Sequence, residues 1–312
     1  MAKKKSKSNY LNGLLLVFIV VSVAAIVYVL SVQEQKPQAE KGKQAKKITE
    51  QKQDPAQKKT EKVIAPEKKK EKQVVAKIEK SPLPKKQVAI IIDDIGHDLE
   101  AVHALLKINA DITFSILPFL THSREAAEII RRSKKEILLH LPMEPVSYPA
   151  DKPGEGALFT DMNDKELLHQ LDKNIDSVPY VVGVNNHMGS KFMVEKEKLI
   201  LIFGRLKKKN LFFIDSRTAV NSQAVAASKV IGLPLAERKI FIDNNRDYKE
   251  IYNNLMSAAN YNNDSSPLIL IGHPYPETIR AIKDAVKELQ KKGIVIVPVS
   301  QTLKAKQSAG IS

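Results

Sequence analysis

The chain has 312 residues, a formal net charge of +15 and no cysteine. The lack of cysteine excludes disulfides, thiolate nucleophiles and cysteine-ligated zinc. Residues 1–86 hold 21 lysines and 8 acidic residues, so residues 87–312 carry a net charge of only +2. Because a nucleic-acid groove needs basic residues clustered on the folded domain itself, this distribution argues against a nucleic-acid partner.

The first 32 residues have the pattern of a membrane anchor. Gly13–Val32 is a run of 20 residues without a charge, which is long enough to cross a bilayer as a helix. The lysines that precede it indicate a cytoplasmic N-terminus. We therefore expect a basic cytoplasmic tail at 1–10, a single transmembrane anchor at 11–32 in the inner membrane, and the rest of the chain outside the cytoplasm. The alternative is a cleaved signal peptide, which would release a secreted protein.

Residues 33–86 have the composition of a disordered linker. The segment is rich in Lys, Glu, Gln and Pro and has no aromatic residue. Such a segment buries too little apolar surface to offset the entropy lost on folding. We expect a solvated tether, and the alternative is a basic strip attracted to anionic lipid or cell-wall polymer.

From residue 87 onward, short apolar runs alternate with amphipathic stretches, which predicts alternating strands and helices. The predicted strands are Gln87–Asp93, Ile112–Leu117, Ile137–Leu141, Tyr180–Val184, Leu211–Ile214, Lys239–Ile242, Leu268–Ile271 and Ile294–Val297. The predicted helices are Asp98–Lys107, Ser123–Lys134, Asp164–Ser177, Glu195–Lys209, Ser222–Val230, Tyr248–Ala259 and Glu277–Lys292. This order predicts an α/β fold with a parallel sheet, and seven or eight such units favour a barrel.

Polar residues follow most of the predicted strands, mainly Asp, Asn and His. In a parallel barrel the carboxyl ends of all strands share one face, where active sites form. These residues therefore predict one convergent pocket, although each also has a structural interpretation. The pair Asp93-Asp94 can be part of a turn, and His140 lies in an apolar run that suits a core histidine.

The pocket has the residues of a metallohydrolase. Two histidines and one carboxylate are a common ligand set for a catalytic divalent ion, and Asp94, His140 and His187 supply it. Asp93 is then available as the general base, provided that the chain turns at Gly96 so that both carboxylates reach the site. A further histidine can protonate a leaving group, and two strand-end residues can orient the acid or the base. These three residues are His273, Arg217 and Asp215.

Five segments of the chain resemble the divergent polysaccharide deacetylase family, a branch of the NodB-like superfamily. They are VAIIIDDIG (88–96), HLPME (140–144), GVNNHMGS (183–190), DSRT (215–218) and IGHP (271–274). The resemblance covers about Gln87–Leu303 and leaves 304–312 as a tail. It implies a deformed (β/α) barrel with seven or eight units and metal-dependent hydrolysis of N-acetyl groups on sugars.

The resemblance also implies roles for individual residues. Asp93 matches the family's base, Asp94 and His140 match metal ligands, and His273 matches the acid. Glu144 stands where a second metal histidine is expected. His187 then replaces that ligand from another strand, Glu144 binds the metal itself, or nothing fills the position.

The expected cofactor is a divalent metal, Zn2+ or a similar ion, and the expected substrate is an envelope polysaccharide or glycan. Two alternatives stay open. One is a non-catalytic envelope protein that keeps the barrel as a binding or scaffold domain. The other is a different metallohydrolase on the same centre, such as an amidase or esterase.

Overall fold

The computed structural model describes residues 86–261 and 268–308. The predicted cytoplasmic tail, anchor and linker lie outside this part of the chain, apart from the linker's last residue. Within the two described ranges, no helix is both long and apolar enough to cross a membrane.

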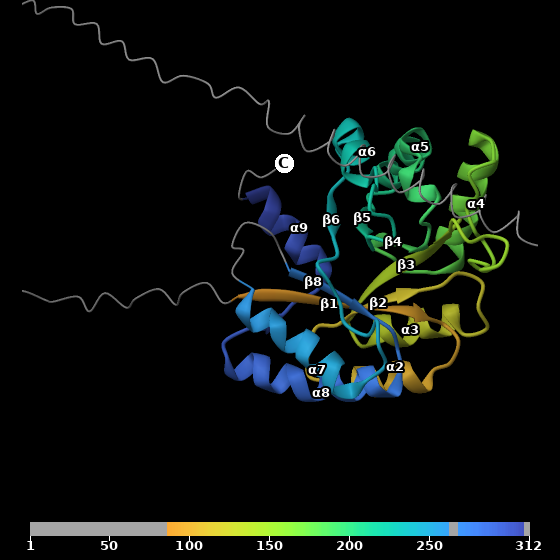
Figure 1. The fold of residues 1–312 in the computed structure, drawn as a ribbon. Coiled ribbons are helices and arrows are strands. Elements are labelled where there is room, and N and C mark those ends of the chain that lie inside the picture. The colour runs from red at the N-terminus through yellow and green to blue at the C-terminus, as the bar shows by residue number, and fades with distance from the viewer. Residues whose placement is uncertain (1–85, 262–267, 309–312) are drawn as a thin grey trace, which may run out of the picture. The chain divides into compact units, whose positions relative to one another are not determined.

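Strands and helices alternate along the described chain, as the sequence predicts (Figure 1). The strands are β1 (Gln87–Ile95), β2 (Thr113–Ile116), β3 (Glu136–Met143), β4 (Gly183–Met188), β5 (Phe212–Asp215), β6 (Leu235–Glu237), β7 (Ile240–Phe241), β8 (Leu268–Gly272) and β9 (Val295–Ile296). The α-helices are α2 (Glu100–Leu106), α3 (Ser123–Arg132), α4 (Asp164–Ser177), α5 (Lys196–Lys208), α6 (Ala224–Ile231), α7 (Tyr248–Met256), α8 (Pro276–Lys291) and α9 (Val299–Ser308). Short 3-10 helices lie at Phe192–Val194 and Ser257–Asn260.

All strand pairs in the sheet are parallel, in the order β6-β5-β4-β3-β2-β1-β8-β7, with β9 beside β1. This curled sheet is a partial barrel and not a closed ring, because its end strands β6 and β7 do not pair. Only Arg238 and Lys239 separate these two strands. Paired parallel strands need a crossover connection of a dozen or more residues, and two residues are too few. The chain therefore passes directly from β6 at one edge of the sheet to β7 at the other edge.

Several elements differ from the sequence prediction, and three of the differences affect the site or the core. The strand β6, which lies between predicted elements, was not expected, because its three residues follow Pro234 and give no clear alternation. Strand β4 begins at Gly183 and continues to Met188, later than the predicted 180–184, so the polar residues of this segment lie inside the strand. Helix α9 includes residues 304–308, which the sequence analysis assigned to a tail.

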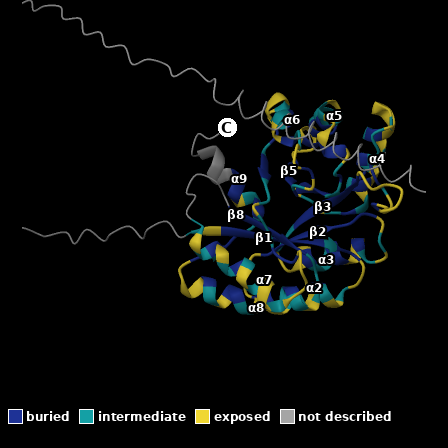
Figure 2. Cartoon of the chain, viewed as in Figure 1, coloured by how far each residue is buried: buried dark blue, intermediate teal, exposed yellow. Residues whose placement is uncertain are grey.

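The strands of the sheet are largely buried (Figure 2). The two faces of the sheet bury different sets of side chains. Alternate strand residues pack on the surrounding helices in a large apolar cluster. The opposite, concave face carries a smaller cluster that α9 completes. Its buried members are Ala89, Ile91, Leu138, Phe212, Ile214, Ala236, Ile269, Ile271, Val299 and Leu303.

Helix α9 is held in the concave face by polar groups of β2 and β3. The backbone N–H of Val299 donates to Oγ1 of Thr113 at 3.1 Å, and that of Ser300 donates to Glu136 Oε1 at 3.1 Å. These acceptors satisfy backbone donors at the start of the helix, which have no partner inside it.

The concave face also determines where the candidate site lies. Side chains two residues apart in a strand point to the same side. Asp93, His140 and His273 each lie two residues after a member of the concave cluster, namely Ile91, Leu138 and Ile271. The same strand faces that bury the inner cluster therefore present the polar residues at the carboxyl ends of the strands.

Candidate metal centre and active site

Strand β1 contains a bulge at the two consecutive carboxylates. Its pairing with β2 shifts register between Ile92 and Ile95, where β1 carries one extra residue. Asp94 adopts a left-handed φ of 56°, a conformation that Asp tolerates better than most residues. Consecutive residues of a regular strand point to opposite faces, so the bulge is what allows Asp93 and Asp94 to face the same site. Gly96, where the sequence predicts the turn, lies beyond it.

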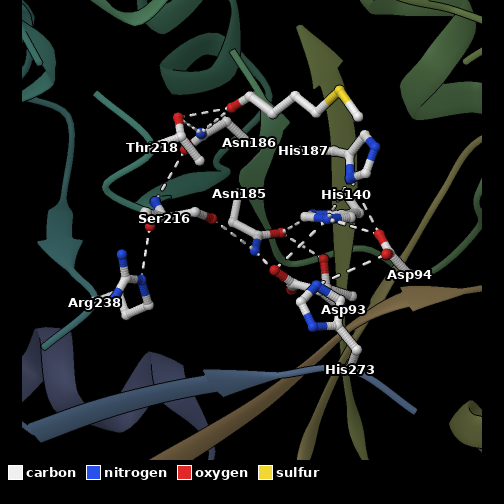
Figure 3. A network of polar contacts seen from close by, with 12 residues as sticks. Asp93, Asp94, His140, Asn185, Asn186, His187, Ser216, Thr218, Arg238 and His273 are labelled. Carbon is white, nitrogen blue, oxygen red and sulfur yellow. Dashed lines mark hydrogen bonds and ion pairs between the residues drawn. The ribbon is translucent and has the colours of Figure 1, made fainter. Parts of the chain in front are cut away.

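Asp94, His140 and His187 bring three potential ligand atoms together from β1, β3 and β4 (Figure 3). Oδ1 of Asp94 lies 3.2 Å from Nε2 of His140 and 3.1 Å from Nδ1 of His187. The two ring nitrogens are 3.2 Å apart. The structure thus brings together the three residues that the sequence predicts as metal ligands.

The geometry of this triangle fits a metal ion. Oδ1 of Asp94 is a buried atom with no hydrogen-bond partner among the described residues, since neither histidine contact has hydrogen-bond geometry. Donor atoms about 2.0–2.2 Å from one divalent ion are separated by roughly 3–3.5 Å. Two imidazoles and one carboxylate also leave coordination positions open for water and substrate.

The two ligand types have opposite pKa shifts. Burial works against ionisation of Asp94, but the ring nitrogens and charges of His140 and His187 outweigh it and hold the pKa of Asp94 well below its usual range. Burial also works against protonation of His140, but Asp93 and Asp94 outweigh it and raise its pKa. An imidazole must be neutral to bind a metal, so metal and proton compete for His140.

Asp93 lies beside the triangle but outside it. Its Oδ2 is 3.6 Å from Nε2 of His140, and its Oδ1 accepts a 2.8 Å hydrogen bond from Nδ2 of Asn185. The residue is 3 % exposed. Burial raises the pKa of Asp93 despite the opposing effects of His140, His273 and Asn185. A raised pKa makes a carboxylate a better proton acceptor.

His273 reaches the site from the end of β8. Its Nε2 lies 3.7 Å from Oδ2 of Asp94, and its Nδ1 lies 3.1 Å from Oδ1 of Asp243. Burial lowers the pKa of His273, but the hydrogen bond and charge of Asp243 outweigh this effect and raise it. A raised pKa favours the protonated form that a general acid requires.

Asp215 and Arg217, predicted to orient the acid or the base, form a separate group. Asp215 is buried and accepts hydrogen bonds from the backbone N–H of Arg217 at 2.7 Å and from Ser222 Oγ at 2.6 Å. The Arg217 side chain pairs with Glu237 at 3.1 Å. The described contacts of these two residues do not include Asp93 or His273. The orienting contacts come from Asn185 and Asp243 instead.

Glu144, considered as an alternative ligand, is not in the ligand cluster. Its Oε2 accepts hydrogen bonds from the backbone N–H and the hydroxyl of Thr160 at 2.7 and 2.6 Å. Its Oε1 pairs with Lys191 Nζ at 2.8 Å. Burial raises the pKa of Glu144, but Lys191 and Thr160 outweigh this and lower it. The carboxylate thus ties the loop after β3 to the loop after β4.

Two residues that contact the predicted base and acid had no role assigned from the sequence. Asn185 directly follows the predicted strand Tyr180–Val184 and Asp243 directly follows Lys239–Ile242, and this position was the available signal. Their partners depend on tertiary structure, because Asp243 is 30 residues from His273 and Asn185 is 92 from Asp93.

A parallel, curled α/β sheet with an Asp-His-His cluster, a second Asp and a further His defines the class of polysaccharide deacetylase-like proteins. Residues 90–303 match the model of the family described as divergent polysaccharide deacetylase, and the chain belongs to that family. The resemblance found in the sequence is thereby confirmed.

Two relatives and one solved structure are similar to the chain over most of its length. The chain is 33% identical over 228 residues to the uncharacterized protein YibQ of Escherichia coli, covering 73% of this chain and 70% of the relative. It is 30% identical over 205 residues to an uncharacterized protein of Haemophilus influenzae, covering 66% and 72%. A crystal structure of an uncharacterized Agrobacterium tumefaciens protein has the same fold, with 23% identity, a TM-score of 0.66 and coverage of 71% and 90%.

Proposed function

We propose that the protein is a metal-dependent hydrolase that removes N-acetyl groups from an envelope polysaccharide or glycan. The observation that carries this proposal is the position of the Asp94-His140-His187 triangle between Asp93 and His273. A ligand set, a basic group and an acidic group within contact distance of each other are the parts that metal-assisted amide hydrolysis needs.

Asp94, His140 and His187 would hold the ion, with Zn2+ as the expected metal. When bound, a divalent ion supplies Lewis acidity, which polarises a carbonyl oxygen and lowers the pKa of water. Nδ1 of His140 lies 3.0 Å from Oδ1 of Asn185, so Nε2 is the ring nitrogen left for the ligand position. Second-neighbour contacts of this kind orient metal-binding histidines.

Asp93 removes a proton from the attacking water. Its Oδ2 faces the ligand cluster while its Oδ1 is fixed by Asn185, so one oxygen remains available for the proton. The water oxygen bonds to the acetyl carbon, and burial of Asp93 favours acceptance of the proton because it raises the pKa.

His273 completes the reaction by protonating the sugar nitrogen as the C–N bond breaks. Asp243 holds its Nδ1, so Nε2 is the atom that faces the cluster and donates the proton. The products are acetate and a free amine on the sugar, and the proton taken by Asp93 balances the one that His273 gives.

We also propose that this reaction takes place outside the cytoplasm, on a domain tethered to the inner membrane. The uncharged run Gly13–Val32, the lysines before it and the basic linker at 33–86 support this location.

The proposal is tested by incubating the purified full-length chain and zinc with N-acetylated oligosaccharides, acetylated peptides and simple acetyl esters. We expect acetate release and a new free amine only with the N-acetylated sugars, abolished by a chelator and restored by zinc. Preferred cleavage of peptides or esters would indicate the other metallohydrolase. Zinc binding without hydrolysis of any class would favour the non-catalytic binding protein.

A further inference from the structure

We propose that Asn185 is a positioning residue that couples the general base to the metal centre. One side-chain amide would both orient Asp93 and determine which ring nitrogen of His140 faces the ligand cluster. The proposal rests on the proposed function for the role of Asp93, while the effect on His140 concerns metal binding alone.

Asn185 has a complete set of hydrogen bonds in a fully buried position (Figure 3). Its Nδ2 donates to Asp93 Oδ1 at 2.8 Å and to Ser216 Oγ at 3.2 Å. Its Oδ1 accepts from Ser115 Oγ, and Nδ1 of His140 lies 3.0 Å away from the same oxygen. A side-chain amide has two N–H donors and two acceptor positions, so all four are used.

The chemistry of these partners fixes the orientation of the amide. An ionised carboxylate only accepts hydrogen bonds, so Asp93 requires the NH2 end of Asn185. The amide oxygen then faces His140, and Nδ1 of that ring must carry the proton. A reversed amide would place its oxygen against the Asp93 carboxylate, and two acceptors would then face each other.

This orientation has a direct consequence for the metal site. A neutral histidine protonated at Nδ1 has its lone pair on Nε2. Nε2 is the atom of His140 that lies 3.2 Å from Asp94 Oδ1 and 3.2 Å from His187 Nδ1. The negative charge on Asp93 thus selects, through Asn185, the tautomer of His140 that can bind a metal.

The position of Asn185 on β4 allows its side chain to contact both Asp93 and His140. In the sheet register it is the direct neighbour of His140 on β3. The next residue, Asn186, points to other partners, accepting from the Ser216 backbone N–H and donating to Met188 O and Thr218 Oγ1. Asn186 therefore ties the end of β4 to the loop after β5, and its hydrogen bonds among the described residues do not include Asp93 or His140.

The two functions of the amide can be separated by substitution in the full-length chain. Asn185→Asp keeps an acceptor for His140 but replaces the donor to Asp93 by a second carboxylate. We expect zinc affinity within about threefold of the parent and a kcat at least about 100-fold lower, because the base is displaced. Asn185→Leu removes both contacts, and we expect zinc affinity to fall roughly 10- to 100-fold as well.

The readouts are a competitive zinc titration, kcat and KM for acetate release, and 15N NMR of histidine-labelled, zinc-loaded protein. A slowly exchanging Nδ1–H on His140 is expected in the parent and in Asn185→Asp but not in Asn185→Leu. Asn174→Asp is the matched control, since Asn174 is equally buried and bonds to Gln170 and Gly156 instead. It is expected to leave zinc affinity and the His140 signal unchanged.

Two results would overturn the proposal: parent-like kcat in Asn185→Asp, or parent-like zinc affinity and a protected His140 Nδ1–H in Asn185→Leu. These results are distinguishable from failure of the proposed function. If the parent hydrolyses no N-acetyl sugar, the hydrolase proposal fails, but the zinc titration and the NMR signal still decide whether Asn185 positions His140.

Discussion

Asp243 contacts His273 with both carboxylate oxygens. Oδ2 accepts the His273 backbone N–H at 2.6 Å and the Thr278 hydroxyl at 2.8 Å, while Oδ1 lies 3.1 Å from Nδ1 of the His273 ring. This arrangement fixes the ring relative to its own backbone. As a result Nε2 is the nitrogen that faces Asp94, 3.7 Å away.

Removing the charge of Asp243 tests whether this contact supports the acid. Asp243→Asn can still bond to Thr278 but no longer stabilises a protonated ring, so we expect kcat to fall about 10²- to 10⁴-fold. Zinc content should remain at the parent level because Asp243 is not in the ligand cluster. Steady-state kinetics and metal analysis check this, with the exposed Asp151→Asn as control. An unchanged kcat would show that the charge of Asp243 does not support the acid.

Asp93→Asn separates the base from the metal site. The amide has nearly the shape of the carboxylate but cannot accept the proton, so we expect zinc binding to persist and turnover to fall by about 10²-fold or more. Zinc affinity and acetate release are measured on the same preparation. Full activity in this variant would show that another group is the base.

The ligand triangle predicts the pattern of metal loss. His140→Ala and His187→Ala each remove one of three ligands, so we expect purified full-length chain to hold close to one zinc ion and each variant to hold far less. Metal analysis after dialysis gives the result, and the exposed helix residue His169 provides the control substitution His169→Ala. An unchanged zinc content in His187→Ala would exclude that residue as a ligand.

The contacts of the buried Glu144 carboxylate with Lys191 and Thr160 predict a pH-dependent contribution to stability. Its pKa is lowered in the folded protein, so its stabilising effect is present above its unfolded pKa and is lost as the pH falls through the folded value. Glu144→Gln should lower the free energy of unfolding at pH 7 by about 1–3 kcal/mol, because Lys191 and Thr160 lose a charged acceptor.

Denaturant unfolding of parent and Glu144→Gln between about pH 3 and 7 measures this effect. The difference between the two proteins should be constant near neutral pH and shrink below about pH 4.5, near the usual Glu value. The exposed Glu155→Gln, in the same loop, should show no such trend. A difference that is independent of pH would contradict the role given to the Glu144 charge.

The alternation of strands and helices was predictable because it depends on local patterns. β-branched runs such as Val88–Ile92 and capping residues such as Asn163, which accepts backbone N–H bonds at the start of α4, act within a few positions of themselves. The strand-end Asp and His residues were predictable for a related reason, since parallel strands bring their carboxyl ends to one edge.

Only the tertiary structure decided how these parts meet. The open edge between β6 and β7, the packing of α9 in the concave face and the bulge at Asp94 depend on contacts between segments far apart in the chain. The same is true of the partners of Glu144, Asn185 and Asp243. Sequence spacing determines the side of a strand on which a residue lies. The atom that each carboxylate or amide contacts is determined by the register of the neighbouring strands, and by the packing that excludes water from these side chains.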